Sequence, residues 1–393
     1  MRLPFPPPRG AARFRTPAIG GALALCGLVV GVVIGRETGV PGLLVGLGLA
    51  LLPLPVLFAA YRWLEAVHPR HWRELAFAFG WGACAATLLA LTANGLLVRL
   101  LTDSPARLSP AHPDTLEITV IAPMVEETAK AAVIGWVWLR QTHLGHGVLV
   151  GLATAGASAA GFAFTENVLY LGSAFAQDQE LGQQGIWDSA MAVTFFVRMV
   201  VAPFAHPMFT ALTGLGFGLA AMLAPGRRRL RLALPALGLG LAMGMHSLWN
   251  ASTSLSLLGF GAVYFLLMAP TLILLCRVAV SARRRELRVV RRTLTHYAAA
   301  GWLAPQEPQA LGCARARRRA RRLGRRAHGP EGARAVADYQ AAATELALLR
   351  DRAGRGLTGD ATDVGFADRE RELLHRLWTH RPLAAPLTLT PDP

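Results

Sequence analysis

Two carboxylates and an ammonium group stand within five residues of one another inside an apolar stretch. Glu126, Glu127 and Lys130 lie in the run from Ile118 to Leu139, which is long enough to cross a lipid bilayer. A charged group costs about 2.5 to 3.5 kcal/mol at the centre of a bilayer, so such groups need partners, a wet cavity or a metal. On a helix Glu126 and Lys130 lie one turn apart and can form an ion pair, whereas Glu127 points about 100° away. We therefore expect Glu127 to find its partner on another helix.

Further acids and histidines occur in the apolar stretches that follow. Glu166 lies in the fifth stretch, His206 follows Pro203 in the sixth, and His246 lies in the seventh. Carboxylates together with two imidazoles are the ligand types of a hydrolytic zinc site, which keeps one position open for water. Without a metal the same residues could still hydrolyse a bond, with a Glu activating water and a His stabilising the oxyanion. The sequence leaves both mechanisms open.

The polar residues of these stretches also have structural explanations. The three acids could form a buried ion-pair network with Lys130 and Arg198, and either histidine could make a hydrogen bond between helices. Acids inside a membrane are functional more often than not, and the shared depth of acids and histidines favours a functional site. We expect Asn167 and Asn250 to orient the site residues or to connect helices, and Arg198 to act as a counter-ion or as an anchor at the membrane interface.

Composition indicates a polytopic membrane protein of the all-α class. Hydrophobic residues make up 53% of the chain and charged residues only 16%. Apolar runs of about twenty residues are the length of membrane-spanning helices. The sequence therefore predicts about eight spans in a membrane domain of residues 1–280, which are residues 17–35, 40–61, 75–101, 118–139, 147–171, 190–223, 232–249 and 256–280.

The distribution of arginine predicts how these spans are oriented. Loops that stay in the cytoplasm keep Lys and Arg, and every second loop here is basic. With both termini in the cytoplasm and the chain in the cell membrane, the acids and histidines fall at one level near the outer face. The arginines on which this orientation depends are Arg2, Arg9, Arg13, Arg15, Arg62, Arg70, Arg73, Arg140, Arg227, Arg228, Arg229 and Arg231.

Residues 281–393 form a predicted cytoplasmic tail that is rich in arginine and partly helical. Its arginines cluster at residues 283–292 and 315–326, and residues 331–352 have the pattern of one helix. Arginines beside the cytoplasmic leaflet are attracted to anionic lipid by about 1 kcal/mol each, which suffices to explain them. Contact with nucleic acid or with a regulatory protein is less favoured, because no aromatic residues alternate with these arginines.

The polar residues form an ordered motif series. Glu126-Glu127-x-x-Lys130, Phe162-x-x-x-Glu166-Asn167, His206 and His246 resemble the motifs of the PrsW family of intramembrane metalloproteases, distant relatives of the type II prenyl-protein (CAAX) endopeptidases. The resemblance covers about residues 20–280. The prenyl-endopeptidase branch has an arginine one place after Lys130 and a histidine in place of Glu166. This chain has neither, although His246-x-x-x-Asn250 fits that branch.

The resemblance implies a membrane-embedded, glutamate-dependent protease. Its substrate would be a membrane-anchored protein, such as an anti-sigma factor, cut near the extracytoplasmic face. Its divalent ion, with zinc as the expected metal, would have ligands among Glu127, Glu166, His206 and His246. The catalytic residues that it implies are Glu126, Glu127, Glu166, His206 and His246.

Three hypotheses of different classes follow from these residues. The first is the protease, with Glu127 as the base that activates water and Glu126 paired with Lys130 or helping to bind metal. The second is a transporter or proton-coupled carrier with the acids as a relay, which predicts an inverted repeat that the hydropathy does not show. The third is a catalytically silent scaffold whose acids are all paired. Convergence of the acids and histidines in one place favours the first over the third.

Overall fold

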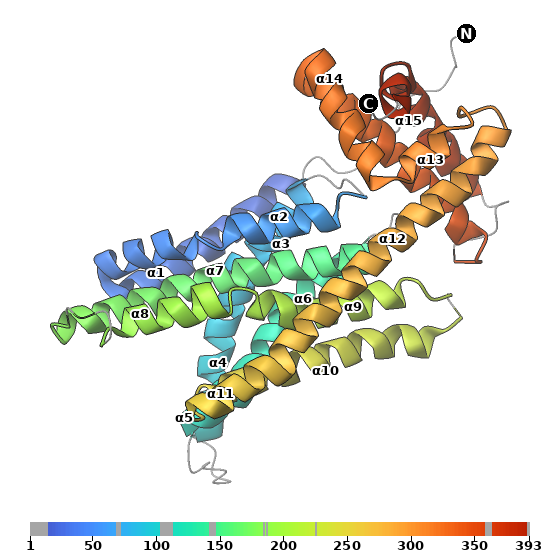
Figure 1. The fold of residues 1–393 in the computed structure, drawn as a ribbon. Helices are drawn as coiled ribbons and strands as arrows, with labels where there is room; N and C mark the ends of the chain where they lie inside the picture. The colour runs from blue at the N-terminus through green and yellow to red at the C-terminus, as the bar shows by residue number, and fades with distance from the viewer. Residues whose placement is uncertain are drawn as a thin grey trace.

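The computed structural model of the protein describes residues 15–67, 72–102, 113–140, 147–183, 185, 188–224, 226–357 and 364–390. Every regular element in these residues is a helix, which confirms the predicted all-α class. Long helices form one elongated bundle, and the helices nearest the C-terminus pack together at one end of it (Figure 1). Arg2, Arg9, Arg13 and Arg70, on which the predicted orientation partly depends, lie outside the described residues.

The helices that build the bundle include four short π-helical segments, labelled η. In chain order they are α1 (Arg15–Ala50), α2 (Leu54–Leu64), α3 (Trp72–Gly80), η1 (Trp81–Ala86), α4 (Thr87–Thr102), α5 (Pro113–Leu116), η2 (Glu117–Ile121), α6 (Ala122–Arg140), α7 (Val148–Glu180), α8 (Ala190–Phe195), η3 (Phe196–Val201), α9 (Ala205–Ala220), α10 (Arg228–Ser252), α11 (Leu257–Val263), η4 (Tyr264–Met268) and α12 (Ala269–Ala299). The chain ends in α13 (Glu307–Leu311), α14 (Ala314–Ala353) and α15 (Val364–Leu389).

Six helical segments of the described chain are long and apolar enough to cross a membrane, so the protein is a multi-pass membrane protein. The first, Ala18–Leu64, covers two of the predicted runs, and Gly39 divides it with a positive φ of 67° that ends the regular helix. Helix α6 is not among the six. Any part of it long enough to cross a membrane contains three charged residues, Glu126, Glu127 and Lys130, and is therefore too polar to be counted. The predicted number of eight spans therefore stays a prediction.

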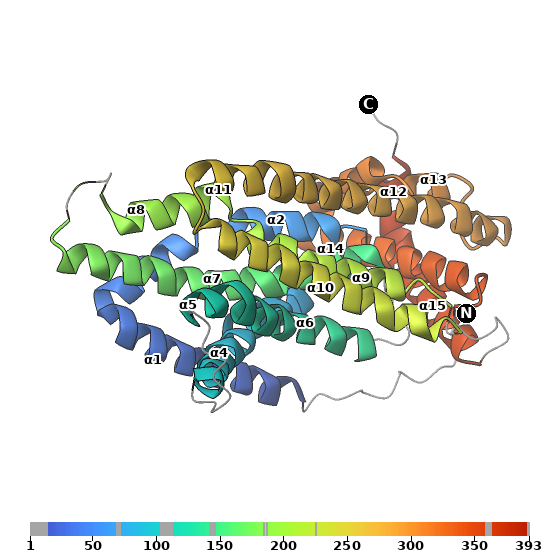
Figure 2. The same cartoon turned by 90° about the horizontal axis from the view of Figure 1, so that it is seen from below.

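Helix α7 lies at the centre of the bundle (Figure 2). In its most apolar stretch 94% of the residues are buried, far more than in any other candidate span of the described chain. Glycines allow neighbouring backbones to approach it: a Cβ on Gly161 would collide with the carbonyl of Phe79, and a Cβ on Gly151 would collide with the carbonyl of Gly214. Small residues therefore bring α7 close to α3 and α9.

The segment from α8 to α9 is a broken helix. The backbone leaves the helical conformation at Ala202 (φ −132°, ψ 42°) and the next helix begins at Ala205. Pro203 lies in this break, where a residue without an N–H group interrupts the helical hydrogen bonds. Such breaks are tolerated inside membrane proteins where the backbone is buried in protein or lines a cavity. This break places His206 in the first turn of α9.

The C-terminal region is a folded helical unit. Helix α12 runs without interruption through the predicted boundary at residue 280, and α14 contains the helix predicted for residues 331–352. Helices α12 to α15 share a hydrophobic core that is separate from the cores of the bundle, with buried side chains that include Val290, Leu294, Leu311, Val336, Tyr339, Leu346, Leu373 and Leu377. The predicted tail therefore has a core of its own in addition to its arginines.

Candidate active site

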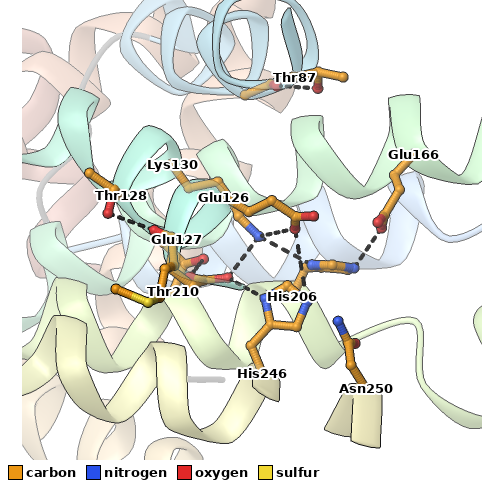
Figure 3. A network of polar contacts seen from close by, with 12 residues as sticks. Thr87, Glu126, Glu127, Thr128, Lys130, Glu166, His206, Thr210, His246 and Asn250 are labelled. Carbon is orange, nitrogen blue, oxygen red and sulfur yellow. Dashed lines mark hydrogen bonds and ion pairs between the residues drawn. The ribbon is translucent and has the colours of Figure 1, made fainter. Parts of the chain in front are cut away.

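The acids and histidines singled out in the sequence meet between four helices of the bundle (Figure 3). Helix α6 supplies the two acids and the lysine of the first motif, and α7, α9 and α10 supply one residue each. This convergence is the arrangement expected of the protease hypothesis, and each acid also has a cationic partner, as the scaffold hypothesis expects. The residues that meet are Glu126, Glu127, Lys130, Glu166, His206 and His246.

Lys130 is the central cation of the site, and its side chain is fully enclosed. Its Nζ lies 2.7 Å from Glu127 Oε1, 3.4 Å from Glu126 Oε2 and 3.3 Å from His206 Nδ1. The ring of Phe162 covers the same ammonium at 4.2 Å from its centroid. The pair with Glu126 matches the expected spacing of four residues, but the shorter contact joins Lys130 to Glu127. One ammonium therefore contacts two carboxylates, and its single positive charge balances only one of them.

Glu127 finds its further partners on other helices, as expected. Thr210 of α9 donates a hydrogen bond from Oγ1 to Glu127 Oε2 at 2.7 Å, and Nδ1 of His246 lies 3.1 Å from Glu127 Oε1. Phe209 stacks on the imidazole of His246, with ring centroids 5.0 Å apart. A carboxylate at Nδ1 fixes the orientation of the ring, so Nε2 of His246 is left facing Glu126 Oε2 at 3.8 Å.

Glu166 occupies the side of the site that is more accessible. Its Oε2 lies 2.7 Å from His206 Nε2 and accepts a hydrogen bond from Arg198 Nη1 at 3.0 Å. Arg198 also donates to Asn167 Oδ1 at 3.1 Å, and its guanidinium lies 3.7 Å from the centre of the Tyr170 ring. The side chains of Glu166 and Arg198 are 13% and 25% exposed, whereas that of Glu127 is completely buried. Glu166 and Arg198 are therefore more accessible than Glu127.

Three of the residues offer ligands that could hold one metal ion. One oxygen of Glu126 and one ring nitrogen each of His206 and His246 lie within 4.8 Å of one another, and the described residues form no other such group. One carboxylate and two imidazoles are a donor set that suits zinc. Glu127 and Glu166, which we predicted as ligands, lie outside this group. Their ligation stays a prediction, and their contacts with Lys130 and Arg198 do not favour it.

The supporting residues behave in two ways. Arg198 and Asn167 lie beside Glu166, as the prediction of a counter-ion and an orienting amide requires. Asn250 instead donates from Nδ2 to the carbonyl of Ile118 at 2.9 Å, which connects α10 to η2. It is a connection between helices, which is one of the two roles expected for it.

Sequence reasoning did not find Thr210, Tyr170 or Phe209. A signal for two of them exists: Thr210 follows His206 by four residues and Tyr170 follows Glu166 by four, so each lies one turn further along the same helix face. Phe209 carries no comparable signal, because an aromatic residue in an apolar helix is most often a packing residue.

Comparisons with known proteins complete the description of the site. Searches of curated proteins and of solved structures find no match to this chain. Among protein families, residues 70–275 match the model described as PrsW family intramembrane metalloprotease, and this range contains every residue of the site. Because the match covers more than half of the 393 residues, the chain belongs to the PrsW family and is an intramembrane protease.

Proposed function

We propose that the protein is a glutamate-dependent, metal-assisted endopeptidase that cleaves a membrane-anchored protein, such as an anti-sigma factor, near the extracytoplasmic face. The observation that carries this proposal is the meeting of Glu126, His206 and His246, from three helices, beside the enclosed pair of Glu127 and Lys130. The proposal includes a cell-membrane location with both termini in the cytoplasm. It also includes contact between the C-terminal arginines and anionic lipid.

Glu126, His206 and His246 would hold the divalent ion, which we propose to be zinc. A zinc ion in such a site supplies the positive charge that lowers the pKa of a bound water toward neutrality. His246 already presents Nε2 to Glu126, because Nδ1 is held by Glu127. Both nitrogens of His206 have partners, since Lys130 lies at Nδ1 and Glu166 at Nε2. His206 must therefore give up one of these contacts to become a ligand.

We assign the proton-transferring role to Glu166 and not to Glu127. Glu127 is fully enclosed, and both of its oxygens already have partners in Lys130, His246 and Thr210. Its contacts suit a residue that orients His246 and neutralises Lys130. Glu166 is partly exposed, and both of its contacts fall on Oε2. A general base needs this access to the proton that it removes.

A metal-free mechanism has one observation in its favour. The ammonium of Lys130 lies within 3.4 Å of both Glu126 and His206, so a positive charge is already present beside these groups. In that mechanism Glu126 activates the water and a histidine stabilises the oxyanion. Removing divalent metals from the purified protein with a chelator separates the two mechanisms: loss of cleavage that zinc restores supports the first, and unchanged cleavage supports the second.

The proposed activity is tested in the membranes of cells that carry the protein. Newly formed N-termini of membrane proteins are compared between the wild-type protein and Glu126→Gln, with Glu117→Gln on the preceding turns as the matched control. We expect a set of N-termini that disappears in Glu126→Gln and persists in Glu117→Gln. An unchanged set in Glu126→Gln would refute the activity.

A further inference from the structure

Five arginines gather where the C-terminal helices meet the end of α2. Arg62 lies in the last turn of α2, Arg283 on α12, and Arg317, Arg318 and Arg321 on the first part of α14. Arg62 is separated from the other four by more than two hundred positions in sequence, and we call the five residues the arginine cluster. None of them has a role in the proposed active site, so the following inference does not rest on the proposed protease activity, although it deepens the proposed contact of the C-terminal arginines with anionic lipid.

Two members of the cluster fasten the C-terminal helices to α2. Arg283 is buried, donates from Nη1 to the carbonyl of Trp63 at 2.8 Å, and lies 4.5 Å from the centre of the Trp63 ring. Arg317 is 2% exposed and donates from Nη2 to the carbonyl of Val67 at 3.1 Å. The carbonyl of Trp63 lies in the last turn of α2, where a positive charge is favourable, and the carbonyl of Val67 lies just after the helix ends.

Arg317 is buried among neutral acceptors. Its other contacts are the carbonyls of Leu311 and Gln340 and the hydroxyl of Thr344. Burial, followed by repulsion from Arg321 and Arg283, lowers the pKa of Arg317 to about 9, so the group is still charged at neutral pH. A buried charge without an opposite charge is costly, and the contacts to neutral groups only partly offset that cost.

The remaining members add charge of the same sign. Burial, followed by repulsion from Arg62, Arg283 and Arg318, lowers the pKa of Arg321. The Nε atoms of Arg317 and Arg321 are buried and have no hydrogen-bond partner among the described residues. In the part of the chain that the structure describes, no carboxylate forms an ion pair with any of the five.

Such a group of guanidiniums is suited to an oxyanion. Each guanidinium presents a planar set of donors that matches phosphate oxygens, and several together bind phosphate far better than one. The exposed members, Arg62 and Arg318, lie on α2 and α14, so an anion between them would contact both parts of the molecule. It would also supply the opposite charge that Arg317 and Arg321 lack.

We propose that the arginine cluster is a binding site for a phosphate group, and that the bound phosphate fastens α12 and α14 to the end of α2. The phosphate belongs either to the headgroup of an anionic phospholipid or to a soluble polyphosphate. Both sources offer the same chemistry to the five arginines. Basic pockets beside membrane-spanning helices commonly take lipid headgroups.

The test uses the full-length protein in nanodiscs and measures its melting temperature. In the first arm the nanodiscs contain only phosphatidylcholine, and pyrophosphate is added against potassium chloride of equal ionic strength. In the second arm phosphatidylglycerol replaces part of the phosphatidylcholine. A rise with pyrophosphate identifies a soluble phosphate, and a rise with phosphatidylglycerol alone identifies a lipid headgroup. No rise in either arm overturns the proposal.

Two double variants test whether the arginine cluster is responsible for the rise in melting temperature. Arg318→Gln/Arg321→Gln removes two members of the cluster and keeps Arg283 and Arg317, whose hydrogen bonds fasten the C-terminal helices to the end of α2. We expect it to raise the half-saturating anion or lipid concentration at least about tenfold. Arg322→Gln/Arg326→Gln removes the same charge from exposed positions of α14 and should leave the response unchanged. An equal loss in both double variants would show that only overall charge matters and would overturn the proposal.

Discussion

The ammonium of Lys130 lies 2.7 Å from Oε1 of Glu127, and neither side chain has any exposed surface. This pair lies three residues apart on α6, and the same ammonium also contacts Glu126 and His206. Lys130 therefore supplies the positive charge that stabilises the two buried acids of α6. The pair holds Glu127 at the position from which it orients His246.

The first prediction concerns the charge of Lys130. Lys130→Met keeps the length of the side chain but leaves two buried carboxylates without a cation. We expect it to lower the free energy of unfolding by about 3 to 5 kcal/mol, as measured by thermal melting of the purified protein. Lys130→Arg keeps the charge and should lose less. A Lys130→Met protein as stable as the wild type would show that Glu126 and Glu127 do not need the ammonium.

The second prediction concerns the hydroxyl of Thr210, which donates to Glu127 at 2.7 Å. Thr210→Val keeps the shape of the side chain and removes the hydrogen-bond donor. Glu127 should then be less firmly oriented and should position the imidazole of His246 less well. We expect zinc affinity or cleavage to fall about 10- to 100-fold, and Thr210→Ser to restore most of it.

The control for Thr210 lies one turn further along α9. Thr213 is also completely buried, and its hydroxyl has no hydrogen-bond partner among the described residues. Thr213→Val should therefore leave cleavage unchanged and keep or raise the melting temperature. Equal losses in Thr210→Val and Thr213→Val would attribute the effect to packing in α9 and not to Glu127.

The third prediction concerns Arg198, which neutralises Glu166 while Glu166 holds His206. Arg198→Met should reduce cleavage about 10- to 100-fold without preventing folding, because the guanidinium is partly exposed. Arg198→Lys should restore only part of the activity, since an ammonium lacks the planar donors that reach Glu166 and Asn167 together. A wild-type cleavage rate in Arg198→Met would show that Arg198 does not contribute to catalysis.

The fourth prediction concerns the close contact of α7 with α3. Gly161→Ala places a methyl group against the carbonyl of Phe79, where backbone must move to make room. We expect a loss of about 1 to 3 kcal/mol in the free energy of unfolding and a lower yield of folded protein. Gly240→Ala is the control, because nothing lies within 4 Å of a Cβ at that position. Equal stability of the two variants would contradict the tight packing of α7.

The residues of the site could be predicted because charged and polar groups are rare in apolar helices. Glu126, Glu127, Glu166, His206 and His246 are costly in a bilayer, and that cost marks them individually. Their convergence in one site depends on how the helices pack around α7. That packing is made by contacts between parts of the chain that are distant in sequence, so the sequence alone does not show it. The sequence alone could not tell that Glu126, and not Glu127, lies in one group with the two histidines.

Other features were hidden for reasons of the same kind. Thr210 reaches Glu127 only because α9 packs against α6, so the sequence held no signal for it beyond its position one turn after His206. The core of the C-terminal region is built from apolar residues of four helices. The many arginines between these residues conceal the apolar pattern in the sequence.

The most direct test measures bound zinc and cleavage on the same preparations of wild-type protein, Glu126→Gln, Glu166→Gln and Glu117→Gln. Once an N-terminus that depends on Glu126 has identified a substrate, that substrate is added to each. We predict that Glu126→Gln loses both zinc and cleavage, that Glu166→Gln at saturating zinc keeps the ion but loses cleavage, and that Glu117→Gln keeps both. A Glu126→Gln protein that keeps its zinc, or a Glu166→Gln protein that cleaves the substrate at the wild-type rate, would contradict the account.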